Sequence, residues 1–116
     1  MPNEQLAIAV EDAAGGECLV TLTGVLTIAT LFEFQSFARA DQSASLIVDL
    51  NGLSYLDSAG LGTLINAYVS RQKSGRKLTL VGVNERVKTV MRVTNVDQFF
   101  TICGTIEEAR GAGAGD

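Results

Sequence analysis

The sequence lacks histidine altogether, although it is 116 residues long. Histidine is the usual base beside a serine nucleophile and the commonest metal ligand, so its absence argues against serine hydrolases and most metal sites. A serine–lysine pair stays open, but the lysine nearest to Ser58 in sequence is Lys73. The phosphate-binding pattern GxxxxGKS/T is also absent, and no lysine follows Gly62. We therefore expect no enzyme, no cofactor and no metal site.

Excess positive charge, paired cysteines and long apolar runs are missing too. The formal net charge is −4, which leaves no basic surface for nucleic acid. The two cysteines, Cys18 and Cys103, form no CxxC pattern and are predicted to be small buried apolar residues. There is no basic, apolar leader and no run of about 18 apolar residues, so we expect a cytoplasmic protein without membrane insertion.

What the sequence does contain is a regular series of short apolar segments. In the first two segments, larger apolar residues alternate with smaller or polar ones. Gly15 and Gly16 lie between the two segments, which favours a hairpin. Residues 46–50 are almost entirely apolar, as in a central strand that is covered on both faces. Strands are predicted at residues 6–10, 18–22, 46–50, 77–83 and 99–103.

Helix-start signals separate these strands. Thr30 and Thr105 each have a glutamate three residues later, the spacing of a capping box, and Asn84 is a third candidate cap. Asn95 can end the helix that follows Asn84, because asparagine tolerates the left-handed conformation. The clearest apolar helix pattern begins at Leu61 and ends near Gly75. Helices are predicted over 31–39, from the 57–61 region to 73, between 84 and 95, and briefly after 105.

This order predicts an α/β fold with a mixed sheet of about five strands and about four helices packed mainly on one face. Residues 1–110 are expected to form one domain, and the glycine- and alanine-rich residues 111–116 a flexible tail. The five phenylalanines are predicted to be mainly core residues: Phe32, Phe34, Phe37, Phe99 and Phe100. One of the first three is expected at the surface.

The segment from Asp57 to Gly62 lies between the central strand and the most regular helix. Asp57 or Ser58 can accept hydrogen bonds from the free N–H groups of the first helical turn. The small residues after Ser58 should leave its hydroxyl reachable from solvent. Such a hexapeptide alone is more often a plain strand-to-helix turn than a regulatory site.

The surrounding sequence resembles the STAS domain, and most closely the bacterial anti-sigma factor antagonists. The likeness runs from about Leu6 to Arg110 and rests on residues 47–62, 77–83 and 93–100. Its most specific part is Asp57 to Gly62, placed after an apolar strand. The resemblance implies that Ser58 is phosphorylated by an anti-sigma factor that is itself a serine kinase. It also implies partner contacts at Asn51, Asp57, Ser58, Ala59, Gly60, Leu61, Gly62 and Thr27.

The expected function is therefore a phosphorylation-switched binding domain. It would sequester the anti-sigma factor kinase when Ser58 is unmodified and release it when Ser58 is phosphorylated. One departure stands out: the family often has Gly-Glu-Leu-Asp after the second strand, whereas this chain has Val25 and Thr27 in place of the acidic pair. That departure motivates an alternative, a constitutive STAS adaptor or scaffold subunit in which Ser58 is only a helix cap. Oligomeric state is left open.

Overall fold

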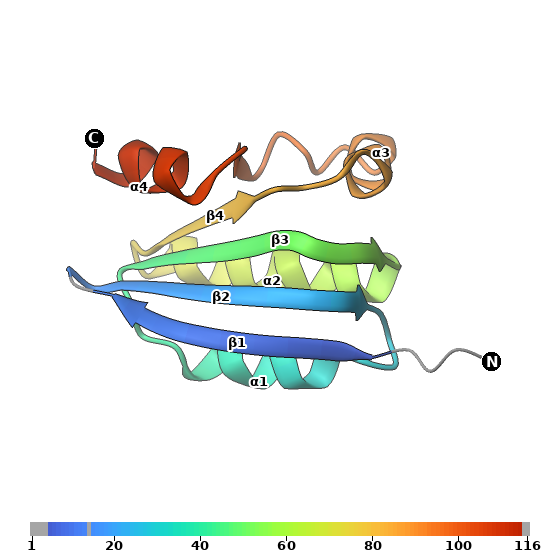
Figure 1. The fold of residues 1–116 in the computed structure, drawn as a ribbon, viewed down its shortest axis with the longest axis horizontal. Helices are drawn as coiled ribbons and strands as arrows, with labels where there is room; N and C mark the ends of the chain where they lie inside the picture. The colour runs from blue at the N-terminus through green and yellow to red at the C-terminus, as the bar shows by residue number, and fades with distance from the viewer. Residues whose placement is uncertain (1–4, 14, 115–116) are drawn as a thin grey trace.

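The computed structural model describes residues 5–13 and 15–114 and has one five-stranded sheet with helices against it (Figure 1). The α/β class and the mixed sheet predicted from the sequence are confirmed. In chain order the elements are β1 (Leu6–Ala13), β2 (Glu17–Leu26), α1 (Leu31–Ala40), β3 (Ser45–Leu56), α2 (Ser58–Lys73), β4 (Lys77–Val81), α3 (Glu85–Val93), β5 (Thr101–Cys103) and α4 (Ile106–Ala114).

The sheet follows the chain order, β1-β2-β3-β4-β5, so β3 is the central strand as predicted. Only β1 runs antiparallel to its neighbour, as the hairpin around Gly15 and Gly16 requires; the other pairs are parallel. Both of these glycines have positive φ, which glycine adopts without steric cost. The carboxyl ends of β2, β3 and β4 therefore point to the same edge of the sheet.

The strand alternation divides the buried side chains between two faces. Leu46 and Val48 of β3 lie in the larger core, which α1, α2 and α3 cover through residues such as Phe34 and Leu64. Ile47 points to the opposite face, where Ala109 of α4 packs against it in a small second cluster. The helices thus lie mainly on one face, with α4 on the other.

The predicted helix starts had different outcomes. Asn84 caps α3 through its side-chain oxygen, which accepts from Val87 N–H at 2.8 Å. Thr105 and Glu108 form the full reciprocal capping box at 3.0 and 3.1 Å. The capping box at Thr30 is wrong, because the Thr30 hydroxyl donates to the Val25 carbonyl at 2.9 Å instead of capping α1.

The predicted ends of several elements also shift. β3 continues to Leu56, well past residue 50, and two register irregularities against β2 accommodate the extra length. β4 ends at Val81, because Gly82 takes a φ of 70°. At the C-terminus, α4 extends to Ala114, into the segment that was predicted to be a tail. Residues 115 and 116 of that tail lie outside the described residues.

Burial of the cysteines and phenylalanines follows the prediction in part. Cys18 and Phe34 are fully buried and Phe100 nearly so, whereas Cys103 is only partly buried. Phe32 is the surface residue among the first three phenylalanines, at 62% exposed. The prediction for Phe99 is wrong, since it is 52% exposed in the loop before β5. Among the described residues, no helix has the length and apolar character needed to span a membrane.

Candidate functional site

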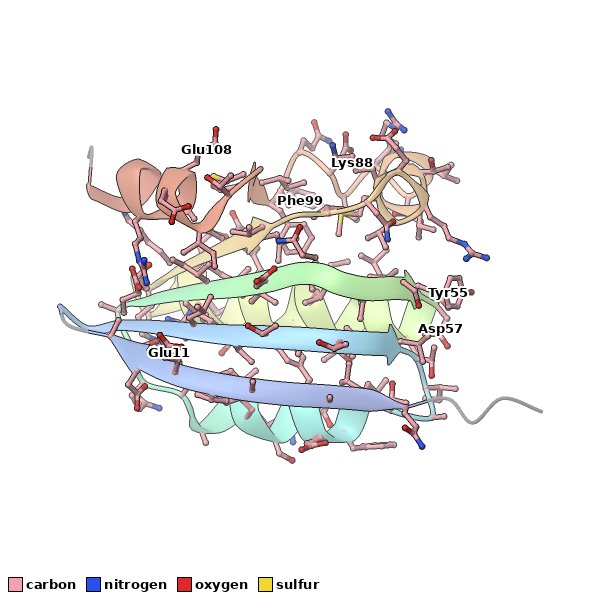
Figure 2. The ribbon with its side chains drawn as sticks, in the orientation of Figure 1. Glu11, Tyr55, Asp57, Lys88, Phe99 and Glu108 are labelled. Atoms are coloured by element: carbon pink, nitrogen blue, oxygen red, sulfur yellow. The ribbon has the colours of Figure 1, made fainter. Side chains whose placement is uncertain are left out.

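The carboxyl end of β3 and the loop after β2 meet at one edge of the sheet. Leu26 and Leu56, the last residues of β2 and β3, are direct neighbours in the parallel pair. Figure 2 shows Tyr55 and Asp57 together at this edge, beyond the arrowhead of β3. Residues 27–30, which lead into α1, and Asp57, which leads into α2, are thereby brought side by side.

Asp57 connects these two segments with its carboxylate. As the N-cap of α2, its Oδ1 accepts from Gly60 N–H at 2.8 Å. Its Oδ2 accepts from Ile28 N–H at 3.0 Å, across a sequence separation of 29 residues. The backbone adds one more link, since Asp57 N–H donates to the Leu26 carbonyl at 3.3 Å. The predicted cap is confirmed, and the second carboxylate bond is a contact that the sequence pattern did not indicate.

Gly60 allows the two segments to come this close. A Cβ atom on Gly60 would overlap the carbonyl of Leu26, a backbone group that cannot swing aside. At Gly62, two residues later, a Cβ atom would meet nothing within 4 Å, so that position carries no comparable constraint. Gly60 therefore serves the packing of α2 against the end of β2.

Ser58 is the first residue of α2, and it is exposed. Its hydroxyl makes no hydrogen bond with any other described residue, so it is free to react or to bind. It lies at the positive end of a helix that runs to Lys73, where added negative charge is locally favourable. The reachability expected from the small residues around Ser58 is thus present.

The other residues predicted to contact a partner do not all lie at this surface. Ala59 and Gly62 are partly exposed beside Ser58, while Gly60 and Leu61 are buried. Thr27 is also buried, at 4% exposed, and its carbonyl accepts from the first N–H groups leading into α1.

Asn51 lies farther away, at an exposed position of β3. Its side chain donates to Asp49 at 2.7 Å and sits against Gly82. With a strand rise of about 3.3 Å per residue, the five steps from Asn51 to Leu56 cover roughly 16 Å. The structure therefore does not bring Asn51 together with Ser58.

Two apolar side chains at the site were missed from the sequence. Ile28 is 62% exposed in the loop that Asp57 holds, and Tyr55 is 37% exposed at the end of β3. The Arg86 guanidinium, from the first turn of α3, lies 5.3 Å from the centre of the Tyr55 ring. The one sequence signal for such an exposed side chain was the presence of an apolar residue, Ile28, in a strand-to-helix loop. Exposure itself depends on the tertiary fold.

The site holds no evident metal-binding group. Within the described part of the chain, no cluster of three or more His, Cys, Asp or Glu side chains is placed to hold an ion. What the edge offers is a free hydroxyl at a helix start, flanked by exposed apolar side chains. That combination suits binding and modification.

The chain is similar to known proteins in sequence and in fold. The family model described as the STAS domain matches residues 8–109. A Thermotoga maritima protein, provisionally named an anti-sigma factor antagonist, is 38% identical over 76 residues, which span 66% of this chain and 66% of the relative. The match thus covers just under two thirds of that relative's length.

Solved structures agree on the fold. An anti-sigma factor antagonist from Mycobacterium paratuberculosis superposes with a TM-score of 0.85 at 23% identity, covering 96% of both chains. The Bacillus cell fate determinant SpoIIAA in its phosphorylated form has a TM-score of 0.74 at 16% identity, covering 92% of this chain and 99% of its own.

Proposed function

Since the chain belongs to the STAS domain family, we propose that it acts as an anti-sigma factor antagonist switched by phosphorylation of Ser58. Unmodified, it binds and sequesters an anti-sigma factor that is a serine kinase; phosphorylated, it releases that partner. The relatives named anti-sigma factor antagonists support the general role. The phosphorylated form of SpoIIAA supports the existence of such a modification in a protein of this fold.

The observation that carries the proposal is the placement of Ser58. It is an exposed hydroxyl without a hydrogen-bond partner among the described residues, at the start of a 16-residue helix. Ile28 and Tyr55, both exposed and apolar, lie at the same edge. We call Ile28, Tyr55 and Ser58 together the switch edge. Ile28 is bonded to Asp57, the residue before Ser58, and Tyr55 is three residues before Ser58. A partner that binds at the switch edge would therefore cover Ser58 together with these apolar side chains.

The physical basis of the switch follows from where the charge would be added. A phosphate adds about −1.5 to −2 charges, which a helix N-terminus favours by roughly 0.3–1 kcal/mol, so the fold tolerates it. A partner covering the switch edge would have to desolvate that dianion. Each 1.4 kcal/mol of such a penalty weakens binding about tenfold. Phosphorylation therefore acts on the complex rather than on the fold.

The modification is tested by incubating the protein with candidate anti-sigma factor kinases and ATP and mapping phosphate by mass spectrometry. We expect one phosphate on Ser58 and none on a Ser58→Ala variant. Ser36→Ala is the matched control, because Ser36 is also an exposed helical serine but lies on α1. Full phosphorylation of Ser58→Ala would overturn the site assignment.

The electrostatic part is tested by comparing Ser58→Asp with Ser58→Asn in binding to the same kinase. The two side chains have nearly the same size and differ by one charge. We expect Ser58→Asp to bind at least tenfold more weakly than Ser58→Asn. Equal affinities would exclude a charge-based switch.

A constitutive adaptor is the second candidate, and the sequence at the end of β2 is what favours it. The acidic pair often found there in the family is replaced by Val25 and Thr27, and Thr27 is buried. An adaptor would take no phosphate, and its Ser58→Asp and Ser58→Asn variants would bind its partner equally well. The same two experiments therefore separate the candidates.

A further inference from the structure

We propose that Asp57 is a positioning residue that holds Ile28 beside Ser58, in addition to capping α2. The consequence for partner binding rests on the proposed function, whereas the positioning itself is a property of the free protein. The aspartate has two acceptor oxygens, and each receives a different backbone N–H. One comes from its own helix and the other from the loop that carries an exposed isoleucine.

The geometry shows why a carboxylate is needed at this position. Oδ1 accepts from Gly60 at 2.8 Å and Oδ2 from Ile28 at 3.0 Å, so both oxygens are occupied by donors. An asparagine has only one acceptor oxygen, and its NH₂ group would face an N–H donor. A serine or threonine also caps helices well but has a single oxygen. Capping alone would therefore accept several residue types, while the double contact selects aspartate.

The loop of residues 27–30 has hydrogen bonds within itself, and Asp57 links it to the start of α2. Its internal bonds run from Thr30 N–H to the Thr27 carbonyl at 3.0 Å and from Ala29 N–H to the Thr27 hydroxyl at 3.2 Å. The Ile28 N–H is bonded to Asp57 and to no other described residue. Breaking that bond would leave these internal hydrogen bonds in place and would remove the side-chain link between Ile28 and the start of α2.

Fixing Ile28 matters because binding costs free energy for every side chain and loop that must be ordered. At 62% exposed, Ile28 offers most of its side chain to a partner. A loop already held at the position needed in the complex removes part of that cost. Asp57 would thus contribute to affinity without touching the partner.

The first test uses the protein alone and measures amide hydrogen exchange by NMR. In Asp57→Asn we expect the Ile28 amide to exchange roughly threefold to tenfold faster, the range for one lost hydrogen bond. The Gly60 amide should keep its protection, because asparagine caps as well as aspartate. Asp97→Asn, the same substitution at a site before β5, is the matched control and should leave Ile28 unchanged. Unchanged exchange of Ile28 in Asp57→Asn overturns the proposal, whatever the partner does.

The second test is a double-mutant cycle on binding to the kinase that phosphorylates Ser58. We expect Asp57→Asn to weaken binding about threefold to tenfold in the wild-type background and less than about twofold when Ile28→Ala is already present. Equal effects in both backgrounds would show that Asp57 does not act through Ile28. Because the exchange test needs no partner, failure of the proposed function and failure of the positioning role give different results.

Discussion

The two ends of the parallel strands are held in different ways. At the amino end, Arg71 of α2 is 2% exposed and ties three segments together. Its Nε donates to the Lys77 carbonyl at 2.8 Å, its Nη1 to Asp41 at 2.9 Å, and its Nη2 to the Ser43 carbonyl. At the carboxyl end, the Asp57 carboxylate links the loop after β2 to the start of α2, next to exposed Ile28 and Tyr55.

The amino end contains a buried, hydrogen-bonded charge that stabilises the fold, whereas the carboxyl end leaves polar and apolar side chains exposed to solvent. Burial lowers the pKa of the Arg71 guanidinium, and the adjacent Asp41 carboxylate offsets part of that effect. Such a buried charge is tolerated because it is paired and hydrogen-bonded, and no buried side-chain polar atom in the described residues lacks a partner. The switch edge, in contrast, keeps a free hydroxyl and apolar groups in solvent. The amino end maintains the fold, and the carboxyl end offers the exposed surface to which the proposed function assigns partner binding.

The largest effect should come from Arg71→Met at the amino end. Removing the guanidinium leaves the Asp41 carboxylate, whose side chain is 10% exposed, without its ion-pair partner. We expect a loss of about 3–5 kcal/mol in the free energy of unfolding, measured by urea denaturation. Lys73→Met, on the exposed side of the same helix end, is the control and should change stability by less than about 0.5 kcal/mol. A loss below about 1 kcal/mol for Arg71→Met would show that the buried ion pair at the amino end does not stabilise the fold more than the carboxyl end does.

The next effect is at the carboxyl end and uses two glycines of one helix. Gly60→Ala would push a methyl group into the Leu26 carbonyl, and we expect a loss of about 1–3 kcal/mol. Gly62→Ala meets nothing and should gain about 0.5–1 kcal/mol from the better helix propensity of alanine. Urea denaturation of both variants checks the pair. Similar values for the two would mean that α2 does not depend on its close approach to β2.

A smaller effect is expected when charge is placed on Ser58. The helix N-terminus favours a negative charge while the neighbouring Asp57 opposes it, so Ser58→Asp should stay within about 1 kcal/mol of Ser58→Asn. Thermal unfolding at low and high salt measures the difference, which should shrink as salt screens it. A larger destabilisation would show that phosphorylation acts on the fold as well as on the complex.

The smallest effect at neutral pH concerns Cys18. Burial, with help from the nearby Asp41 and Asp12, raises its pKa from 9.0 to about 12. Because the folded pKa lies above the unfolded one, the contribution to stability is fully present below about pH 9 and is lost as pH rises toward 12. Unfolding measured against pH should show a decline for wild type that is reduced in Cys18→Ala.

The same cysteine can be followed by thiol labelling at neutral pH. Cys103, which is partly buried, should react before Cys18, which is fully buried and should react only on unfolding. Rapid labelling of Cys18 in the folded protein would contradict its burial near the amino end of β2.

Local signals in the sequence were reliable where the relevant partner lies within a few residues. Asn84 and Asp57 cap the helices that follow them, since the acceptor and its N–H are three residues apart. The reciprocal pair at Thr105 and Glu108 formed for the same reason. Asn95 takes the left-handed conformation expected at a helix end, with a φ of 59°. Such contacts need only the local chain.

Thr30 shows where local reasoning fails. Its spacing to Glu33 matches the capping box, yet its hydroxyl donates to the Val25 carbonyl at the end of β2. An acceptor in the preceding strand competed with the local one, and the turn between β2 and α1 decided the outcome. The separation of Asn51 from Ser58 has a similar origin, because β3 continues to Leu56 and carries the two residues apart.

By itself, the sequence determined the order of strands and helices, the exposed start of α2 and the place of Ser58 on it. Periodicity and caps encode these features over spans of a few residues. Only the tertiary structure decided which distant groups surround Ser58. The second oxygen of Asp57 meets Ile28 across 29 residues because parallel pairing brings the ends of β2 and β3 together, and no pattern along the chain contains that contact.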